Sequence, residues 1–438
     1  MSESTKQKLY YGWIIVASAF VVIFLHLSIR GSFATFINPM REDLGWTTAE
    51  VSLGLSMFMI FYGLTAFFAG GTSTKYGPKI VTLIHGVIFG LGLFLSSFAV
   101  KPWHFYLTYG VMGGIGAGAL FAPPTALVRR WFIKDLAKAL GLATSGAGLG
   151  FFIAPNISMI LIESMSWQDA MKIFGVIVLV GVVIASLFMK RNPEDIGLKP
   201  LGYEQAAAAA GSQNKNQVDF SIDLKSALKT SAFWLLAAMW FCSNFAEYIV
   251  FSHSINYVTL DLGFDKVLAT RIYSLIGVCF FVMGIFAGSY IDKLGAKLND
   301  PFKARKIVLA CCYGVALLSS ILLNSVANPA MYVAYAIMFG LCFGIYIPTV
   351  AGYVGTVFGR KYIGPIWGLI TTIGMAGGAG LGPYFGGWLR DLTGNYTLAI
   401  WVATIFFGLT ALLCLAVKKP SEAEQEKKVP AKPGVQPL

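Results

Sequence analysis

The sequence predicts an all-α membrane protein, with twelve transmembrane helices arranged as two similar six-helix bundles. Three observations predict this fold class: an apolar composition, regularly spaced apolar runs and an internal repeat. Of the 438 residues, 56% are hydrophobic and 12% are charged, and the mean hydropathy is +0.69. Soluble domains carry about 25% charged residues. A chain with so few charges is therefore expected to face lipid over much of its surface.

Twelve apolar runs are long enough to cross about 30 Å of hydrocarbon as helices. They cover residues 11–36, 49–70, 80–99, 104–128, 138–162, 169–188, 231–257, 270–291, 306–325, 328–350, 364–389 and 396–417. The first run exceeds the length of a signal peptide and ends without a small-residue cleavage site, so we interpret it as the first membrane helix.

The runs divide the chain into two bundles joined by a polar segment. The linker includes a five-alanine run and a polar stretch that cannot bury a core, although a short surface helix fits it. The charged tail is expected to be disordered. We predict an N-terminal bundle at 1–189, a linker at 190–230, a C-terminal bundle at 231–417 and a tail at 418–438.

Positive charges predict the orientation in the membrane. Of the 33 Lys and Arg, 26 fall on the side of the termini and the linker, six on the opposite side, and Arg30 lies within a run. By the positive-inside rule, we expect a multi-pass protein of the cytoplasmic (inner) membrane with both termini in the cytoplasm. The net charge of +12 follows from this distribution and indicates no nucleic-acid partner.

The two halves repeat each other at a nearly constant offset. Asp43-Leu44-Gly45 after the first run matches Asp261-Leu262-Gly263 after the seventh at an offset of 218. Three more matches occur in the same order, which indicates a duplicated six-helix unit. They join Lys75, Gly77 and Lys79 with Lys293, Gly295 and Lys297; Met112, Gly114 and Gly118 with Met338, Gly340 and Gly344; and Gly146–Gly150 with Gly378–Gly382.

The segment Gly70–Lys79 resembles the signature loop between the second and third helices of the major facilitator superfamily, and Gly288–Lys297 is its second copy. The second copy keeps an acidic residue, Asp292, where the first has Thr74. Glycine permits a tight turn, and Asp292 can pair with a basic residue or a helix N-terminus. The resemblance implies a gating role for Gly71, Lys75, Gly77, Lys79, Asp292, Lys293, Gly295 and Lys297.

Three further stretches, Ala122–Phe132, Gly141–Gly150 and Ser252–Gly263, together resemble bacterial monocarboxylate transporters and the related oxalate/formate antiporter group. The resemblance runs from about Tyr10 to Val417. It implies alternating-access transport of small carboxylates, which monocarboxylate transporters move together with a proton. We also expect a monomer in the lipid bilayer that needs no cofactor and no metal.

Two alternatives to a monocarboxylate–proton symporter stay open: an organic anion exchanger and a non-transporting membrane sensor. The sequence contains no evident signalling domain, which disfavours the sensor. An enzyme is not expected, because no nucleophile–base set, phosphate loop or metal motif is present.

Two ionised residues are predicted well inside the spans: Arg30 in the first and Glu247 in the seventh. A lone charge at mid-bilayer costs about 2.5–3.5 kcal/mol, so each should face a cavity or a partner. Arg30 can bind a carboxylate through two parallel hydrogen bonds, as the span-one lysine of monocarboxylate transporters implies. Glu247 is the candidate proton carrier. The alternative is a permanent Arg30–Glu247 ion pair that only joins the halves.

Other candidates are less specific, because each is also a common packing residue. His26 precedes Arg30 by one turn, and His253 lies near the outer end of span seven, so either could relay protons or be structural. The remaining candidate substrate-binding residues are Phe121, Asn244, Tyr346 and Tyr384.

The second half departs from the family pattern. Span eight reads Ile276–Gly284 without a charge, and span eleven has none before Arg390, so the usual second anion anchor is missing. This absence favours a monoanion over a dianion and questions the usual proton mechanism.

Overall fold

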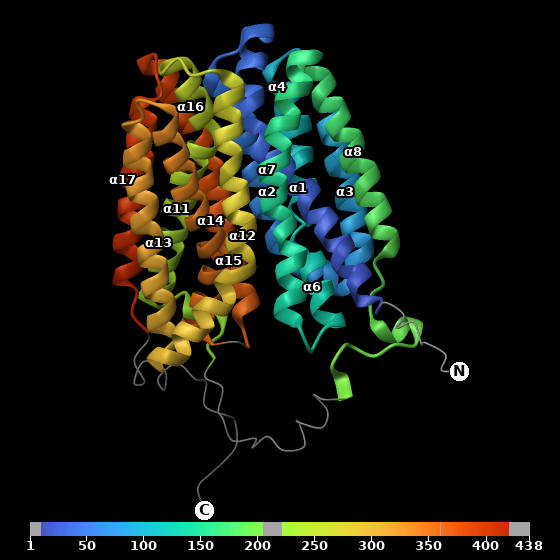
Figure 1. The fold of residues 1–438 in the computed structure, drawn as a ribbon. Coiled ribbons are helices and arrows are strands. Elements are labelled where there is room, and N and C mark those ends of the chain that lie inside the picture. Colours follow the sequence, from blue (N-terminus) through green and yellow to red (C-terminus); the bar gives the residue numbers. More distant parts are fainter. Residues whose placement is uncertain (1–9, 205–220, 360, 420–438) are drawn as a thin grey trace, which may run out of the picture.

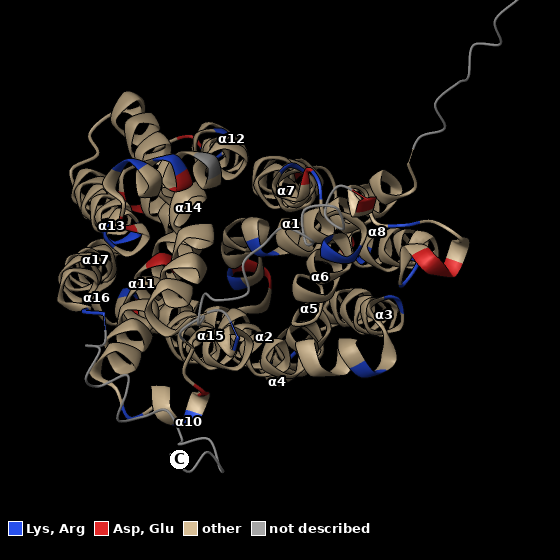
Figure 2. Ribbon diagram, turned by 90° about the horizontal axis from the view of Figure 1, so that it is seen from below, with Lys and Arg blue, Asp and Glu red and all other residues tan. Residues whose placement is uncertain are grey.

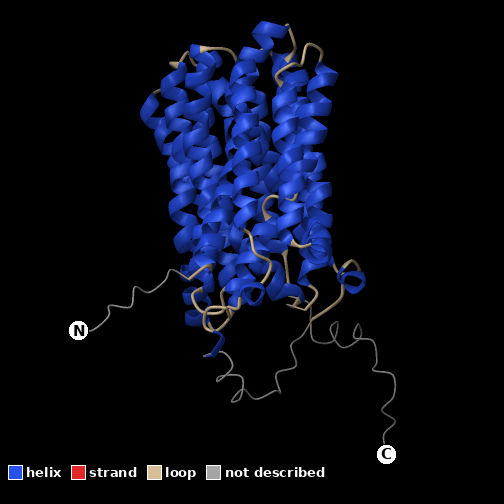
Figure 3. Ribbon diagram, turned by 90° about the vertical axis from the view of Figure 1, so that its right-hand side faces the viewer, coloured by secondary structure: helices blue, strands red, loops and turns tan. Residues whose placement is uncertain are grey.

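The computed structural model describes residues 10–204, 221–359 and 361–419. These residues form helices and connecting segments (Figure 3). One isolated β-bridge joins Phe132 and Leu201. The helices run nearly along one axis and form two groups (Figure 1). We call the end that carries the described linker residues 190–204 and 221–230 the linker end, and the other the opposite end.

The first half contains six crossings. The fourth is a composite in which a π-helix interrupts the α-helix. The crossings are α1 (Gly12–Leu44), α2 (Thr48–Tyr76), α3 (Pro78–Ser96), the series α4 (Pro102–Phe105), η1 (Tyr106–Gly113), α5 (Gly114–Ala117) and α6 (Ala122–Trp131), then α7 (Leu136–Ser164) and α8 (Trp167–Phe188).

After η2 (Pro193–Ile196) and α10 (Leu224–Ala227), the second half repeats this order. Its crossings are α11 (Ser231–Asn256) with η3 (Tyr257–Asp261), α12 (Lys266–Leu298), α13 (Pro301–Asn324), α14 (Pro329–Phe358), the series α15 (Ile363–Thr372), η4 (Ile373–Ala379) and α16 (Gly380–Thr393), and α17 (Thr397–Ala416). Among the described residues, eleven crossings are long and apolar enough to span a membrane. The twelfth is the α15–η4–α16 series.

The predicted twelve-helix fold in two bundles is confirmed, but several helices are longer than their apolar runs. For example, α1 continues to Leu44 and α12 to Leu298. Helical hydrogen bonds are satisfied within the segment, so a helix can continue past the hydrocarbon into water. The linker boundaries stay a prediction, since its alanine run and polar stretch lie within 205–220, outside the described residues.

Each half has its own apolar core, and a few side chains cross between the two. The core of the second half includes Phe151 and Leu27 from the first, and the core of the first half includes Tyr248 from the second. Viewed along the helices, the halves meet where α2 lies beside α15 and α7 lies beside α12 (Figure 2).

The sequence repeat corresponds to a repeated contact. Gly45 and Gly263 both have positive φ, at 68° and 73°, which glycine adopts readily. The preceding aspartates each bind the start of the sixth helix of their own half. Asp43 accepts hydrogen bonds from the side chains of Trp167 and Gln168 at 2.9 and 2.6 Å. Asp261 accepts the backbone N–H of Tyr396 at 2.6 Å.

The two signature segments turn at different residues. In the first copy, Gly71 and Lys75 lie within α2, and the chain turns at Gly77 with φ +90°. In the second copy, Gly295 lies inside α12, and the left-handed residue is Asn299 with φ 50°. The expectation that a glycine makes the turn is therefore wrong for the second copy, because asparagine also tolerates this conformation.

The interface between the halves is tight from its middle to the opposite end. A Cβ built on Gly387 would lie 2.9 Å from the carbonyl oxygen of Thr48, and one on Gly63 would lie 2.6 Å from the backbone nitrogen of Ala376. Nearer the linker end, a Cβ on Gly368 would lie 3.5 Å from Phe67, and one on Gly71 meets nothing within 4 Å. The halves therefore diverge toward the linker end (Figure 1).

Candidate functional site

Arg30 lies in α1 where the two halves meet. Its guanidinium carbon is 5.1 Å from the ring centre of Tyr62 in α2 and 5.3 Å from that of Tyr248 in α11. Both distances fall within the range of cation–π contacts. The Nε atom is buried without a hydrogen-bond partner, although the residue as a whole keeps partial exposure. Within the described ranges, no acidic side chain lies within 4.0 Å of Arg30.

Glu247 lies in α11, next in sequence to the Tyr248 that contacts Arg30. It is 3% exposed, and its carboxylate accepts a hydrogen bond from the hydroxyl of Tyr346 in α14. A buried carboxylate needs such a donor, because an unsatisfied charge in a low dielectric is costly. The structure thus places a carboxyl group and a cation on the neighbouring first helices of the two halves, with Tyr248 in contact with Arg30 and next to Glu247 in the chain.

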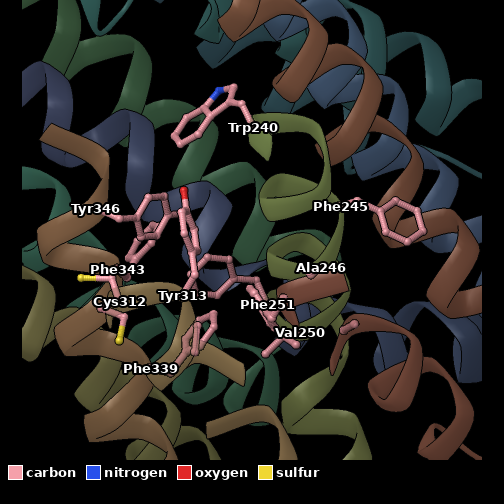
Figure 4. Close-up of a cluster of buried hydrophobic side chains, with 14 of the residues drawn as sticks. Trp240, Phe245, Ala246, Val250, Phe251, Cys312, Tyr313, Phe339, Phe343 and Tyr346 are labelled. Atoms are coloured by element: carbon pink, nitrogen blue, oxygen red, sulfur yellow. The ribbon is translucent and has the colours of Figure 1, made fainter. Parts of the chain in front are cut away.

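Aromatic side chains surround Tyr346. Its ring centre lies 5.9 Å from Trp240, 5.6 Å from Tyr313 and 5.8 Å from Phe343. Figure 4 shows Tyr346 and Tyr313 side by side, with Phe343 and Phe251 in the same cluster. These rings pack around the tyrosine that donates to Glu247.

A phenylalanine cluster lies on the opposite-end side of Glu247. Phe251 follows Glu247 by one helical turn, and its ring centre is 4.9 Å from Phe343 and 5.2 Å from Phe151. Phe151 comes from α7 of the first half, so the cluster joins both halves. Its position between Glu247 and the opposite end fits an apolar barrier there.

His26 is fully buried beside Tyr62, with which it stacks at 5.4 Å. Neither ring nitrogen has a hydrogen-bond partner in the described chain. Phe89 of α3 covers another side at 6.2 Å. His26 and Arg30 therefore share Tyr62, and His26 lies among the aromatic residues of the first-half core.

For three other predicted residues, the structure shows hydrogen bonds or exposure that do not involve Arg30 or Glu247. His253 Nε2 is 2.9 Å from the carbonyl oxygen of Pro383, and its ring stacks on Tyr396 at 5.2 Å. Asn244 donates to the carbonyl of Trp240 one turn earlier, at 2.7 Å. The side chain of Tyr384 is 40% exposed.

Phe121 behaves differently from these three. It precedes α6, where the fourth crossing is interrupted, and it packs against the core of the second half. An aromatic side chain at this break therefore reaches across the interface.

The partners of Arg30 were not predicted. Tyr248 could be singled out from the sequence repeat, because the offset of 218 pairs it with Arg30. No feature of the sequence singled out Tyr62, because a tyrosine in an apolar run is also an ordinary packing residue.

The predicted gating residues lie at the linker end, and the two copies differ in their contacts. In the second copy, Arg305 of α13 donates to Asp292 at 3.1 Å. In the first, Arg191 donates instead to the backbone carbonyl of Thr74 at 3.0 Å. The first copy thus offers a main-chain acceptor, and its arginine comes from the segment that follows α8.

Comparison with known families and proteins agrees with this architecture. The family model described as Major Facilitator Superfamily matches residues 19–378 and, in a second match, residues 294–437. A solved structure of the nucleoside transporter NupG is similar in fold, with a TM-score of 0.64 at 15% identity. The alignment covers 92% of this chain and 98% of that one.

Curated relatives extend over nearly the whole chain. Monocarboxylate transporter 13 of Rattus norvegicus is 27% identical, over 90% of this chain and 86% of the relative. Monocarboxylate transporter 12 of Xenopus laevis is 26% identical, over 94% and 91%. The probable sulfoacetate transporter SauU of Cupriavidus necator is 24% identical, over 94% and 95%. These relatives confirm the resemblance predicted from the sequence motifs.

Proposed function

The chain belongs to the Major Facilitator Superfamily, its relatives are transporters and not enzymes, and from this premise we propose that it carries a small organic monocarboxylate. Transport would cross the cytoplasmic (inner) membrane by alternating access, with proton symport and with both termini in the cytoplasm. The linker end would then face the cytoplasm. The protein would act as a monomer.

The position of Arg30 carries this proposal. Its guanidinium lies at the interface of the halves, held by two tyrosine faces, and none of the described acidic residues lies within 4.0 Å. Contacts through the ring faces fix the plane of the guanidinium and leave its N–H groups for an anion. A carboxylate can accept two parallel hydrogen bonds from such a group.

The charge of the substrate follows from what surrounds this arginine. The stretch Ile276–Gly284 of span eight and the predicted span eleven before Arg390 contribute no second cation. One cation balances one negative charge, which supports a monoanion. The names of the relatives, monocarboxylate and sulfoacetate transporters, support a small organic acid.

Glu247 would couple the proton. Its buried carboxylate is stabilised by the Tyr346 hydroxyl and by the positive field of the nearby Arg30. An anion that binds Arg30 would neutralise that field and so favour the protonated form of Glu247. Anion and proton would then bind together and leave together, which is symport.

Two further features of the structure would have supporting roles in transport. Phe121 would contribute to the wall of the pathway, and the Asp292–Arg305 pair would stabilise the linker end of the second half. For Asn244, Tyr384, His26 and His253, direct contact with substrate or proton stays a prediction.

Reconstituted vesicles separate symport from exchange. Uptake of a labelled monocarboxylate such as lactate into empty vesicles, driven by an imposed pH gradient with the acidic side outside, is expected for symport. An organic anion exchanger instead requires unlabelled anion inside and ignores the gradient. Uptake that needs internal anion and is insensitive to the gradient would contradict the symport proposal.

A further inference from the structure

At the opposite end, the last turn of α16 meets the first turn of α2. The carboxylate of Asp391 in α16 accepts the backbone N–H of Thr48 at 3.1 Å and that of Ala49 at 2.7 Å. Thr48 and Ala49 are the first two residues of α2, so Asp391 occupies the positive end of a 29-residue helix from the other half. Charge-assisted bonds at a helix N-terminus are among the stronger polar contacts in proteins.

The helices are packed closely at this point, where the bond from Thr48 is partly buried and the bond from Ala49 is exposed. A Cβ built on Gly387 would lie 2.9 Å from both the carbonyl oxygen of Thr48 and the hydroxyl oxygen of Ser52. One turn further along, Ser56 accepts the backbone N–H of Tyr384 at 3.0 Å. The guanidinium of Arg390 lies 3.8 Å from the Asp391 carboxylate within the same half.

The hydrogen bonds of Asp391 differ from the other described hydrogen bonds between the halves. The remaining interhalf hydrogen bonds of the described residues use neutral groups, such as Asn256 to the carbonyl of Ala34 at 3.1 Å and Thr372 to that of Gly63 at 3.3 Å. Asp391 is the one ionised side chain that hydrogen-bonds across the interface within those residues.

The symmetry-related junction lacks this contact. The glycine clusters at Gly146 and Gly378 are offset by 232 residues, which pairs Asp391 with Met159 of α7. Methionine is at best a weak acceptor. The first turn of α12 is instead capped locally. Asp265, the residue before the helix, accepts the backbone N–H of Leu268 at 2.8 Å. No hydrogen bond joins α7 and α12 among the residues described.

We propose that Asp391 is a positioning residue for the transport cycle, which holds the opposite end closed while the halves diverge toward the linker end. The proposal rests on the alternating access included in the proposed function, and it does not depend on the identity of the anion or on proton coupling. Opening of the opposite end separates α16 from α2 and so breaks both Asp391 bonds. Their loss therefore shifts the conformational balance toward the state that is open at that end.

The test uses a cysteine at the junction as a reporter. Ser52 is fully buried, its hydroxyl has no partner in the described structure, and Cys is close to it in size. Ser52→Cys in the purified full-length protein in detergent is labelled with a maleimide, and the rate is corrected for the six native cysteines by the same measurement without Ser52→Cys. No substrate is needed, so failure of the carboxylate proposal does not affect the readout.

Asp391→Asn is expected to raise the labelling rate of Ser52→Cys about tenfold, within the usual range of coupling between two conformational states. Asp391→Glu keeps the charge and should stay close to the parent. The matched control is Glu50→Gln, because Glu50 caps the same helix terminus from within α2 by accepting the N–H of Thr47 at 2.8 Å. It should leave the rate nearly unchanged.

A second variant removes a donor and leaves Asp391 in place. Ala49→Pro deletes one of the two N–H groups, and proline is tolerated in the first turn of a helix. It should raise the rate about threefold, and it serves as the test if Asp391→Asn does not fold. The proposal is overturned if the rate stays at the parent value in both variants, or if Glu50→Gln raises it as much as Asp391→Asn.

Discussion

In the first half, α1 places a cation between two tyrosine rings; in the second, the repeat-related α11 places a carboxylate against a tyrosine hydroxyl. The halves nevertheless keep the same aspartate and glycine after these helices, at Asp43-Gly45 and Asp261-Gly263. In both halves the aspartate accepts a hydrogen bond from the start of the sixth helix, from side chains in the first half and from the backbone in the second. Duplication has thus preserved the scaffold while the centre has become asymmetric. The following predictions test whether that asymmetry carries the function.

Arg30→Ala should have the largest effect. Two hydrogen bonds to a charged group contribute roughly 3 kcal/mol or more together, so uptake should fall at least about 100-fold while the protein still reaches the membrane. Vesicle uptake of the labelled anion measures it. Arg271→Ala, which removes an exposed arginine at the start of α12, is the control and should transport normally. Normal uptake by Arg30→Ala would exclude the binding role.

Glu247→Gln should uncouple transport from the proton. Glutamine keeps the shape and an acceptor for Tyr346 but cannot exchange a proton, so accumulation driven by a pH gradient should disappear while anion exchange persists. Gradient-driven accumulation and counterflow are measured on the same vesicles. The exposed Glu163 on α7 offers the control Glu163→Gln. If the Glu247 variant still accumulates anion, the proton assignment is wrong.

Tyr346→Phe should have a smaller effect, because the carboxyl group itself remains. A hydrogen bond to a charged group contributes about 1.5–3 kcal/mol, part of which water can replace, so we expect uptake to fall about tenfold or less. Tyr313→Phe is the matched control, since the Tyr313 hydroxyl has no partner in the described residues and its ring lies tilted against Tyr346, with the ring centres 5.6 Å apart. Equal losses in the two variants would argue against a role of the Tyr346–Glu247 bond.

Tyr248→Leu should have the smallest effect of the series. A cation–π contact contributes about 0.5–2 kcal/mol, so the concentration of anion for half-maximal uptake should rise a few-fold. Tyr248→Phe keeps the ring and should match the parent in the same concentration series. A loss with Phe as large as that with Leu would indicate that the hydroxyl, and not the ring face, supports Arg30.

The fold could be predicted almost completely from the sequence, because long apolar runs, charge asymmetry and repeats each reflect a constraint of the bilayer. The turn at Asn299 could not be predicted. Gly295 corresponds to the turning glycine of the first copy, Gly77, but α12 continues as a helix through it. Helix ends depend on local contacts in water, which hydropathy does not report.

The charged residues of the candidate site could be located from the sequence, because burying a charge in an apolar run is expensive. The neutral residues mostly could not. Arg30 and Glu247 stand out as ionised residues in apolar runs, whereas Tyr62 does not. For His253 the sequence suggests proton relay, and the structure shows contacts with Pro383 and Tyr396, so its role stays a prediction. A neutral or aromatic side chain gains its role only from what three-dimensional packing brings beside it.

A competition panel tests the central claim, that one arginine between the two halves selects a small organic monoanion. Uptake of a labelled monocarboxylate into reconstituted vesicles is measured against unlabelled monocarboxylates, sulfonates, dicarboxylates, neutral amides and organic cations, with and without a pH gradient. We predict strong competition by monoanions, weaker competition by dianions and none by amides or cations. Competition by neutral amides equal to that of the matching carboxylates would contradict the account.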